Sequence, residues 1–110
     1  MEVVLTPKFR STVKKLRRRY RNVTHDFRSL VVDLLSGEKP GDRLQDVGGA
    51  EVYKVRLQNT SARLSKRDGF RVVYHVGEMA ITLLVICQKP RCANVQPVRI
   101  RQLMDELDLT

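Results

Sequence analysis

The fold is decided by residues 70–87, FRVVYHVGEMAITLLVIC, in which two apolar runs flank a Gly-Glu pair. The first run alternates between a face with Phe70, Val72, Tyr74 and Val76 and a face with Arg71, Val73 and His75. Alternation of this kind is typical of a strand, whose successive side chains point to opposite faces. Residues 79–87 are apolar on both faces, which favours an interior strand, and Gly77-Glu78 predicts a tight turn between the two strands.

A third strand is predicted upstream, over residues 52–58, VYKVRLQ. Its two faces differ in chemistry, with Tyr53, Val55 and Leu57 on one and Lys54, Arg56 and Gln58 on the other. The Gly- and Pro-rich residues 37–49 before it predict a loop, because these residue types interrupt regular structure. We therefore expect an antiparallel sheet with one apolar and one basic face.

Two helices are predicted between a short strand at residues 2–5 and this sheet. Thr6 and Pro7 form a helix start, and the apolar residues after them have helical spacing: Phe9, Val13, Leu16 and Tyr20. A second helix is expected from a Thr24 cap to Gly37, with the apolar stripe Phe27, Leu30, Val31, Leu34 and Leu35. The spacing of Ile100, Leu103, Met104 and Leu107 predicts a short C-terminal helix.

These elements predict an α+β fold of two layers, in which two antiparallel helices pack on an antiparallel sheet of about four strands. A chain of 110 residues has room for one core, so residues 1–110 are expected to form a single domain. The same length excludes Rossmann-type and barrel enzymes. Because the helices should cover the apolar face of the sheet, the face with Lys54, Arg56 and Arg71 is expected to look outward.

Charge is the most informative bulk property of the chain. Lys and Arg number 21 against 12 Asp and Glu, for a formal net charge of +9, and the basic residues cluster in residues 8–28, 54–71 and 89–101. Such clusters favour a polyanionic partner, since each phosphate contact releases condensed counterions. Nucleic acid is the first candidate. The alternative is a basic surface that keeps the protein soluble or binds an acidic protein.

The remaining composition predicts a cytoplasmic protein without metal or cofactor. The longest apolar stretch, residues 80–87, is far shorter than the roughly 20 residues that cross a bilayer, and the first residues lack the apolar centre of a secretory signal. Cys87 and Cys92 are expected to be reduced thiols. His25 and His75 lie far apart in sequence and belong to no cluster with metal-ligand spacing.

Residues 52–89 carry a resemblance to a known family. They contain a Val-Tyr-Lys-x-Arg strand, Lys66 in the next turn, the run Gly69-Phe70-Arg71-Val72-Val73-Tyr74, and an aliphatic strand that ends in Lys89. Upstream, Leu34-Leu35-x-Gly37, Pro40-Gly41-Asp42 and Val47-Gly48-Gly49 fit the same pattern. In this order the segments resemble the RelE/ParE superfamily of bacterial toxins, in particular its RelE-like and HigB-like RNA-cleaving members.

The resemblance implies a toxin of a type II toxin–antitoxin system, an endoribonuclease that cuts messenger RNA on the ribosome and inhibits translation. Its implied partners are a cognate antitoxin, the ribosome and messenger RNA. Lys54 and Arg56 match the family's basic pair, and Arg71 matches the arginine of its Gly-aromatic-Arg motif. Lys66 matches a basic loop residue, and Arg91 lies near the second catalytic arginine. The C-terminal catalytic tyrosine of RelE has no counterpart, because Val95, Gln96 and Pro97 occupy that region.

Cleavage without a metal ion needs a base for the 2′-OH, cations for the phosphorane and a donor for the leaving oxygen. We assign Lys54 as the base, because adjacent arginines favour loss of its proton. Arg71 and Arg56 are the predicted phosphate ligands. Lys66, Lys89 or Arg91 is the predicted donor, and the predicted RNA or ribosome contacts are Lys66, Lys89, Arg91, Lys14, Arg17 and Arg18.

Each assignment has a structural alternative. Lys54 and Arg56 are also explained as solvated residues of an exposed strand face, and His75 either as an acid–base group or as a packed residue. At the level of function, two alternatives stay open. One is a ParE-like, non-nucleolytic toxin that acts on DNA gyrase, and the other is an inactive RNA-binding homologue.

Overall fold

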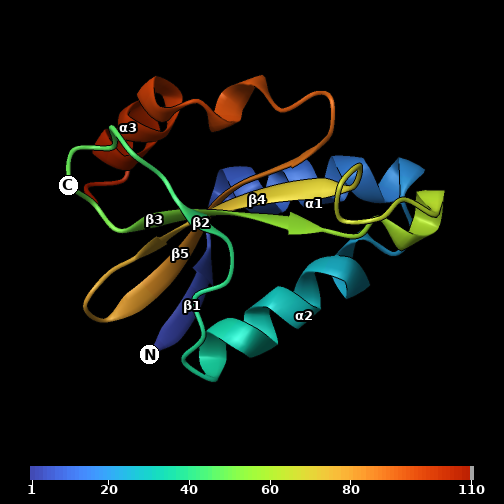
Figure 1. Cartoon of the computed structure of the whole chain (residues 1–110), viewed down its shortest axis with the longest axis horizontal. Helices are drawn as coiled ribbons and strands as arrows, with labels where there is room; N and C mark the ends of the chain where they lie inside the picture. Colours follow the sequence, from blue (N-terminus) through green and yellow to red (C-terminus); the bar gives the residue numbers. More distant parts are fainter. Residues whose placement is uncertain (110) are drawn as a thin grey trace.

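The computed structural model describes residues 1–109 (Figure 1). One five-stranded sheet has the strand order β1-β5-β4-β3-β2. The strands are β1 (Glu2–Leu5), β2 (Asp42–Arg43), β3 (Val52–Leu57), β4 (Phe70–Val76) and β5 (Ala80–Gln88). The helices are α1 (Pro7–Arg19), α2 (Val23–Leu35) and α3 (Pro97–Glu106), with 3₁₀ turns η1 (Thr60–Ala62) and η2 (Ala93–Val95). The predicted α+β class is confirmed.

The predicted antiparallel sheet of about four strands is wrong in two respects. The meander β3-β4-β5 is antiparallel as expected, but β1 runs parallel to β5, so the sheet is mixed. The two-residue strand β2 pairs with β3 at Tyr53 and Lys54. β1 and β2 lie at the two edges of the meander, β1 beside β5 and β2 beside β3. The unpaired N–H and C=O groups of a sheet edge readily accept another strand.

The helix ends follow local chemistry with one exception. The Thr6 hydroxyl accepts a hydrogen bond from Phe9 N at 3.0 Å, so the predicted start of α1 is confirmed. The predicted Thr24 cap is wrong, because α2 begins at Val23 and Thr24 lies within it. Asn22 holds the cap position, and its side-chain amide donates to Thr60 Oγ1 at 3.3 Å instead of capping the helix. Gly37 follows α2 with φ of 93°, a conformation that favours glycine.

The helical layer of α1 and α2 covers one face of the sheet, as predicted. Phe9, Phe27 and Leu30 are buried against Val72 and Tyr74. The prediction that Leu35 belongs to the buried stripe is wrong, because this last residue of α2 is 60% exposed. It follows the buried Leu34, and one residue turns a helix by about 100°.

A second core lies on the other face, where only solvent was expected. Ile100 and Met104 of α3 are fully buried against strand residues of the second face, namely Val52, Val73, Leu84 and Val85. Figure 1 shows α3 and α2 on opposite sides of the sheet. The predicted two-layer arrangement is therefore wrong for this end of the sheet, because β5 is apolar on both faces and each face requires a cover.

The expectation of reduced cysteines is also wrong, since Cys87 and Cys92 form a disulfide with a Cα–Cα distance of 5.4 Å. The chain reverses directly after β5, where Arg91 N donates to Gln88 O at 2.8 Å. This turn brings two residues five positions apart into bonding range. No helix within residues 1–109 is long and apolar enough to cross a membrane.

Candidate functional site

The three predicted catalytic residues share one face of neighbouring strands. Arg56 of β3 pairs in register with Arg71 of β4, and Lys54 pairs with Val73. Paired residues of adjacent strands point to the same side of a sheet, so Lys54, Arg56 and Arg71 lie on the face that also carries α3. Lys54 lies opposite Val73 of the second core, and the Arg56–Arg71 pair lies two positions beyond it.

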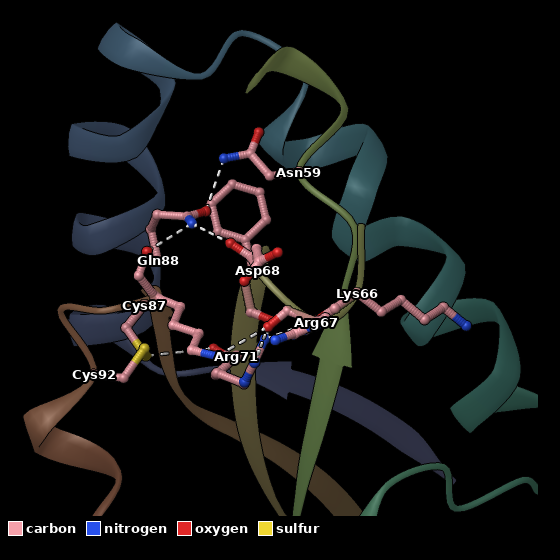
Figure 2. Close-up of a disulfide and its surroundings, with 10 residues drawn as sticks. Asn59, Lys66, Arg67, Asp68, Arg71, Cys87, Gln88 and Cys92 are labelled. Atoms are coloured by element: carbon pink, nitrogen blue, oxygen red, sulfur yellow. Dashed lines mark hydrogen bonds between the residues drawn. A yellow bond between two sulfur atoms is a disulfide. The ribbon is translucent and has the colours of Figure 1, made fainter. Parts of the chain in front are cut away.

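Exposure separates the three residues. Arg56 is exposed and Lys54 half-buried, but Arg71 is only 7% exposed. The Arg71 guanidinium donates hydrogen bonds to the backbone carbonyls of Lys66 (2.9 Å), Arg67 (2.6 Å) and Phe70 (3.2 Å), as Figure 2 shows. Burial lowers the pKa of Arg71, and the positive charge of Arg56 lowers it further, while Asp68 opposes both. Arg71 therefore anchors the turn that precedes its own strand.

The loop between β3 and β4 has further fixed points. Asn59 is fully buried, donates from Nδ2 to Gln88 Oε1 at 2.8 Å and accepts from Ala62 N at 3.2 Å. Gln88 in turn donates to the carbonyl oxygen of Asp68 at 2.7 Å. A side chain at Gly69 would overlap the carbonyl oxygen of Leu57, so only glycine fits there. These contacts fix the backbone that carries Lys66 and Arg67.

A cleft of about 560 Å³ separates α2 from β3. Its cationic lining comes from Arg56, Lys66 and Arg28, and its acidic lining from Asp26 and Asp33. The Lys66 side chain points away from the Arg71 guanidinium and toward α2 (Figure 2). The structure thus brings Lys66 to Arg56 but not to the head group of Arg71.

Asp26 joins this cleft to the loop. Its carboxylate is buried and accepts hydrogen bonds from Thr60 N at 3.0 Å and Thr60 Oγ1 at 2.8 Å. These two bonds join α2 to η1, and both residues line the cleft. Nothing in the sequence pattern singled out Asp26, because a lone carboxylate in an amphipathic helix is ordinarily solvated.

The remaining predicted contacts fall into two groups. Lys89 Nζ donates to the carbonyl oxygen of Arg67 at 3.3 Å, an acceptor that it shares with Arg71, and Arg91 follows on the exposed loop. Lys14, Arg17 and Arg18 line a separate hollow on α1 of about 500 Å³ and are not brought to the strand face.

His75 does not join the other candidate residues. It pairs with Val52, four positions from Arg71, which corresponds to about 13 Å along a strand. The ring is 9% exposed, and its Nδ1 has no hydrogen-bond partner within the described chain. Burial lowers the pKa of His75, while nearby Glu51 opposes this. The packed-residue interpretation therefore fits His75 better than an acid–base role beside Arg71.

Comparison with known proteins adds no further assignment. No known family model matches the chain, and no curated protein is significantly similar to it. Across residues 1–109, no three His, Cys, Asp or Glu side chains gather as metal ligands would.

Proposed function

We propose that this protein is the toxin of a type II toxin–antitoxin system, with a RelE-like fold, and that it cleaves messenger RNA on the ribosome in the cytoplasm. The observation that carries the proposal is the pairing of Arg56 with Arg71, with Lys54 two positions along the same face. Lys54 and Arg56 form no salt bridge with the described residues, so no acidic side chain competes with RNA for their head groups.

The chemistry proposed for this face needs no metal ion. Lys54 in its neutral form removes the proton of the ribose 2′-OH, and the 2′-oxygen attacks the adjacent phosphorus. The exposed guanidinium of Arg56 binds the non-bridging oxygens of the phosphorane, and the charge of Arg71 adds to the local field. The 5′-oxygen leaves with a proton, for which we choose Lys89 because it shares an acceptor with Arg71. The products are a 2′,3′-cyclic phosphate and a 5′-hydroxyl.

The proposed partners follow from the same assignment. The ribosome presents the messenger RNA, and a cognate antitoxin neutralises the basic surface when the toxin is held inactive. Since Val95, Gln96 and Pro97 stand where RelE has its catalytic tyrosine, the cations must supply the acid–base chemistry on their own.

Induced expression in bacteria, followed by primer extension on messenger RNA, tests the proposal. We expect cuts inside translated codons, and we expect Arg56→Ala to reduce cleavage about 100-fold or more, because it removes one transition-state contact. Arg101→Ala is the matched control, since Arg101 is an exposed arginine on α3 and its loss should leave cleavage unchanged.

Two other outcomes decide against the proposal. Double-strand DNA breaks with intact messages would favour a toxin that acts on gyrase. Absence of both kinds of damage would favour an RNA-binding protein without cleavage activity.

A further inference from the structure

A further basic hollow adjoins the proposed cleavage site at Lys89. It encloses about 890 Å³ between α1 and the segment that ends β5 and turns at Pro90. Four cations line it, Lys15 and Arg19 from α1 and Lys89 and Arg91 from the turn. Its lining also has an apolar part, formed by Leu16, Tyr20, Leu64 and Ile86. We call this hollow the α1 groove.

The charge of the α1 groove is of one sign. Among the described residues that line it, none is acidic, whereas Asp26 and Asp33 line the cleft beside α2. Its four cations form no salt bridge with any residue of the described chain. Cations without an acidic partner, placed around apolar side chains, favour an anionic ligand that also has flat apolar groups to pack on those side chains.

Several contacts hold the rim of the groove in place. The Arg19 guanidinium lies 5.5 Å from the centroid of the Tyr20 ring, which packs edge-on against Phe70 at 5.7 Å. On the opposite rim, Lys89 donates to the carbonyl oxygen of Arg67, and the disulfide closes the turn. A rim held in this way loses less conformational entropy when a ligand binds.

We propose that the α1 groove binds a single strand of RNA, with its phosphates on Lys15, Arg19 and Arg91 and its bases against the apolar floor. Lys89 links the groove to Arg71 through their shared acceptor, so one strand can extend from the groove toward the strand face. The choice of RNA rests on the proposed function. The binding itself needs neither cleavage nor the ribosome.

The test is a titration of fluorescein-labelled ten-nucleotide oligouridine, followed by fluorescence anisotropy at several salt concentrations without ribosomes. We expect the double variant Lys15→Ala/Arg19→Ala to bind about tenfold more weakly or worse. Its slope of log K against log salt should fall by about 1.4, since each phosphate contact on a single strand contributes about 0.7.

The matched control is Lys8→Ala/Arg10→Ala. It removes the same two charges from the same helix, and all four side chains are exposed, so both proteins should fold. The control should keep the wild-type salt slope. Equal losses in the two variants would overturn the proposal, because they would indicate a diffuse basic surface rather than a groove.

A duplex of the same length supplies the second criterion. Duplex RNA shields its bases, so it should bind more weakly than the single strand, and equal affinity would overturn the use of the apolar floor. Failure of the cleavage proposal is distinguishable, because the anisotropy titration measures binding without ribosomes and without cleavage. Binding that depends on Lys15 and Arg19, in a protein that cuts no messenger RNA, would overturn the cleavage proposal alone.

Discussion

Arg71 belongs to the proposed site and also holds the turn before β4 through hydrogen bonds to its backbone. Its register with Arg56 follows from strand pairing, but its guanidinium is occupied by three backbone carbonyls. Arg71→Ala would remove this donor from all three carbonyls, of which Arg67 O still accepts from Lys89 Nζ, and hydrogen bonds to charged groups contribute about 1.5–3 kcal/mol each. Loss of activity in that variant alone would not identify a catalytic role.

We predict that Arg71→Ala lowers the free energy of unfolding by about 3 kcal/mol, because one buried donor group is lost from three acceptors. Arg56→Ala, at the paired position, should change it by less than about 0.5 kcal/mol, because Arg56 is exposed and its side chain forms no salt bridge in the described chain. Urea denaturation measures both values. Equal stabilities of the two variants would contradict the anchoring role of Arg71.

At the scale of elements, the turn after β5 connects the sheet to α3 and also lines the α1 groove. Its disulfide joins Cys87, which pairs with Arg71 in the sheet, to the segment that leads into η2 and α3. Lys89 and Arg91 lie within the closed loop, on the rim of the α1 groove. The covalent closure therefore determines where two predicted RNA contacts lie.

We predict that Cys92→Ala lowers the free energy of unfolding by about 2 kcal/mol, the cost of opening a covalent loop of this short length. A reducing agent should destabilise the wild-type protein by a similar amount and leave the variant unchanged. Urea denaturation with and without dithiothreitol measures the four values. A wild-type protein that is insensitive to reduction would contradict the disulfide.

At the scale of the whole molecule, two cores on opposite faces of one sheet share β4 and β5. His75 lies in β4, buried and with a lowered pKa. The unfolded chain, in which a histidine has its ordinary pKa of about 6.5, therefore binds more protons in acid than the folded protein. The contribution of His75 to stability is complete above about pH 6.5 and is lost as the pH falls through the folded pKa.

We predict that the free energy of unfolding declines between pH 7 and pH 5, and that His75→Leu flattens this decline. A single protonation contributes up to about 1.4 kcal/mol per pH unit. Denaturation series at pH 8, 7, 6 and 5 measure the effect, with pH 8 as the reference where both proteins have a neutral residue at this position. An unchanged decline in His75→Leu would assign the pH dependence to other groups, such as Glu51.

Local patterns in the sequence were enough to predict most of the secondary structure. Spacing of apolar residues predicted α1, α2, α3 and the three meander strands, because burial of one face imposes a period on each element. Strand alternation also predicted that Lys54 and Arg56 share a face, and the registers of β3 and β4 extend this face to Arg71. The RelE-like identity of the fold and the nuclease activity stay predictions.

Which elements contact one another depends on long-range packing in the folded chain. The parallel pairing of β1, the second core under α3, the disulfide and the α1 groove all join residues through contacts that no local period encodes. Lys15 and Arg19 are one helical turn apart, so their common face is readable from sequence. Their position opposite Lys89 and Arg91 cannot be predicted from the sequence pattern, because long-range packing brings the end of β5 to α1. The local sequence determines whether a segment forms a helix or a strand. The burial of apolar faces determines which other elements it packs against.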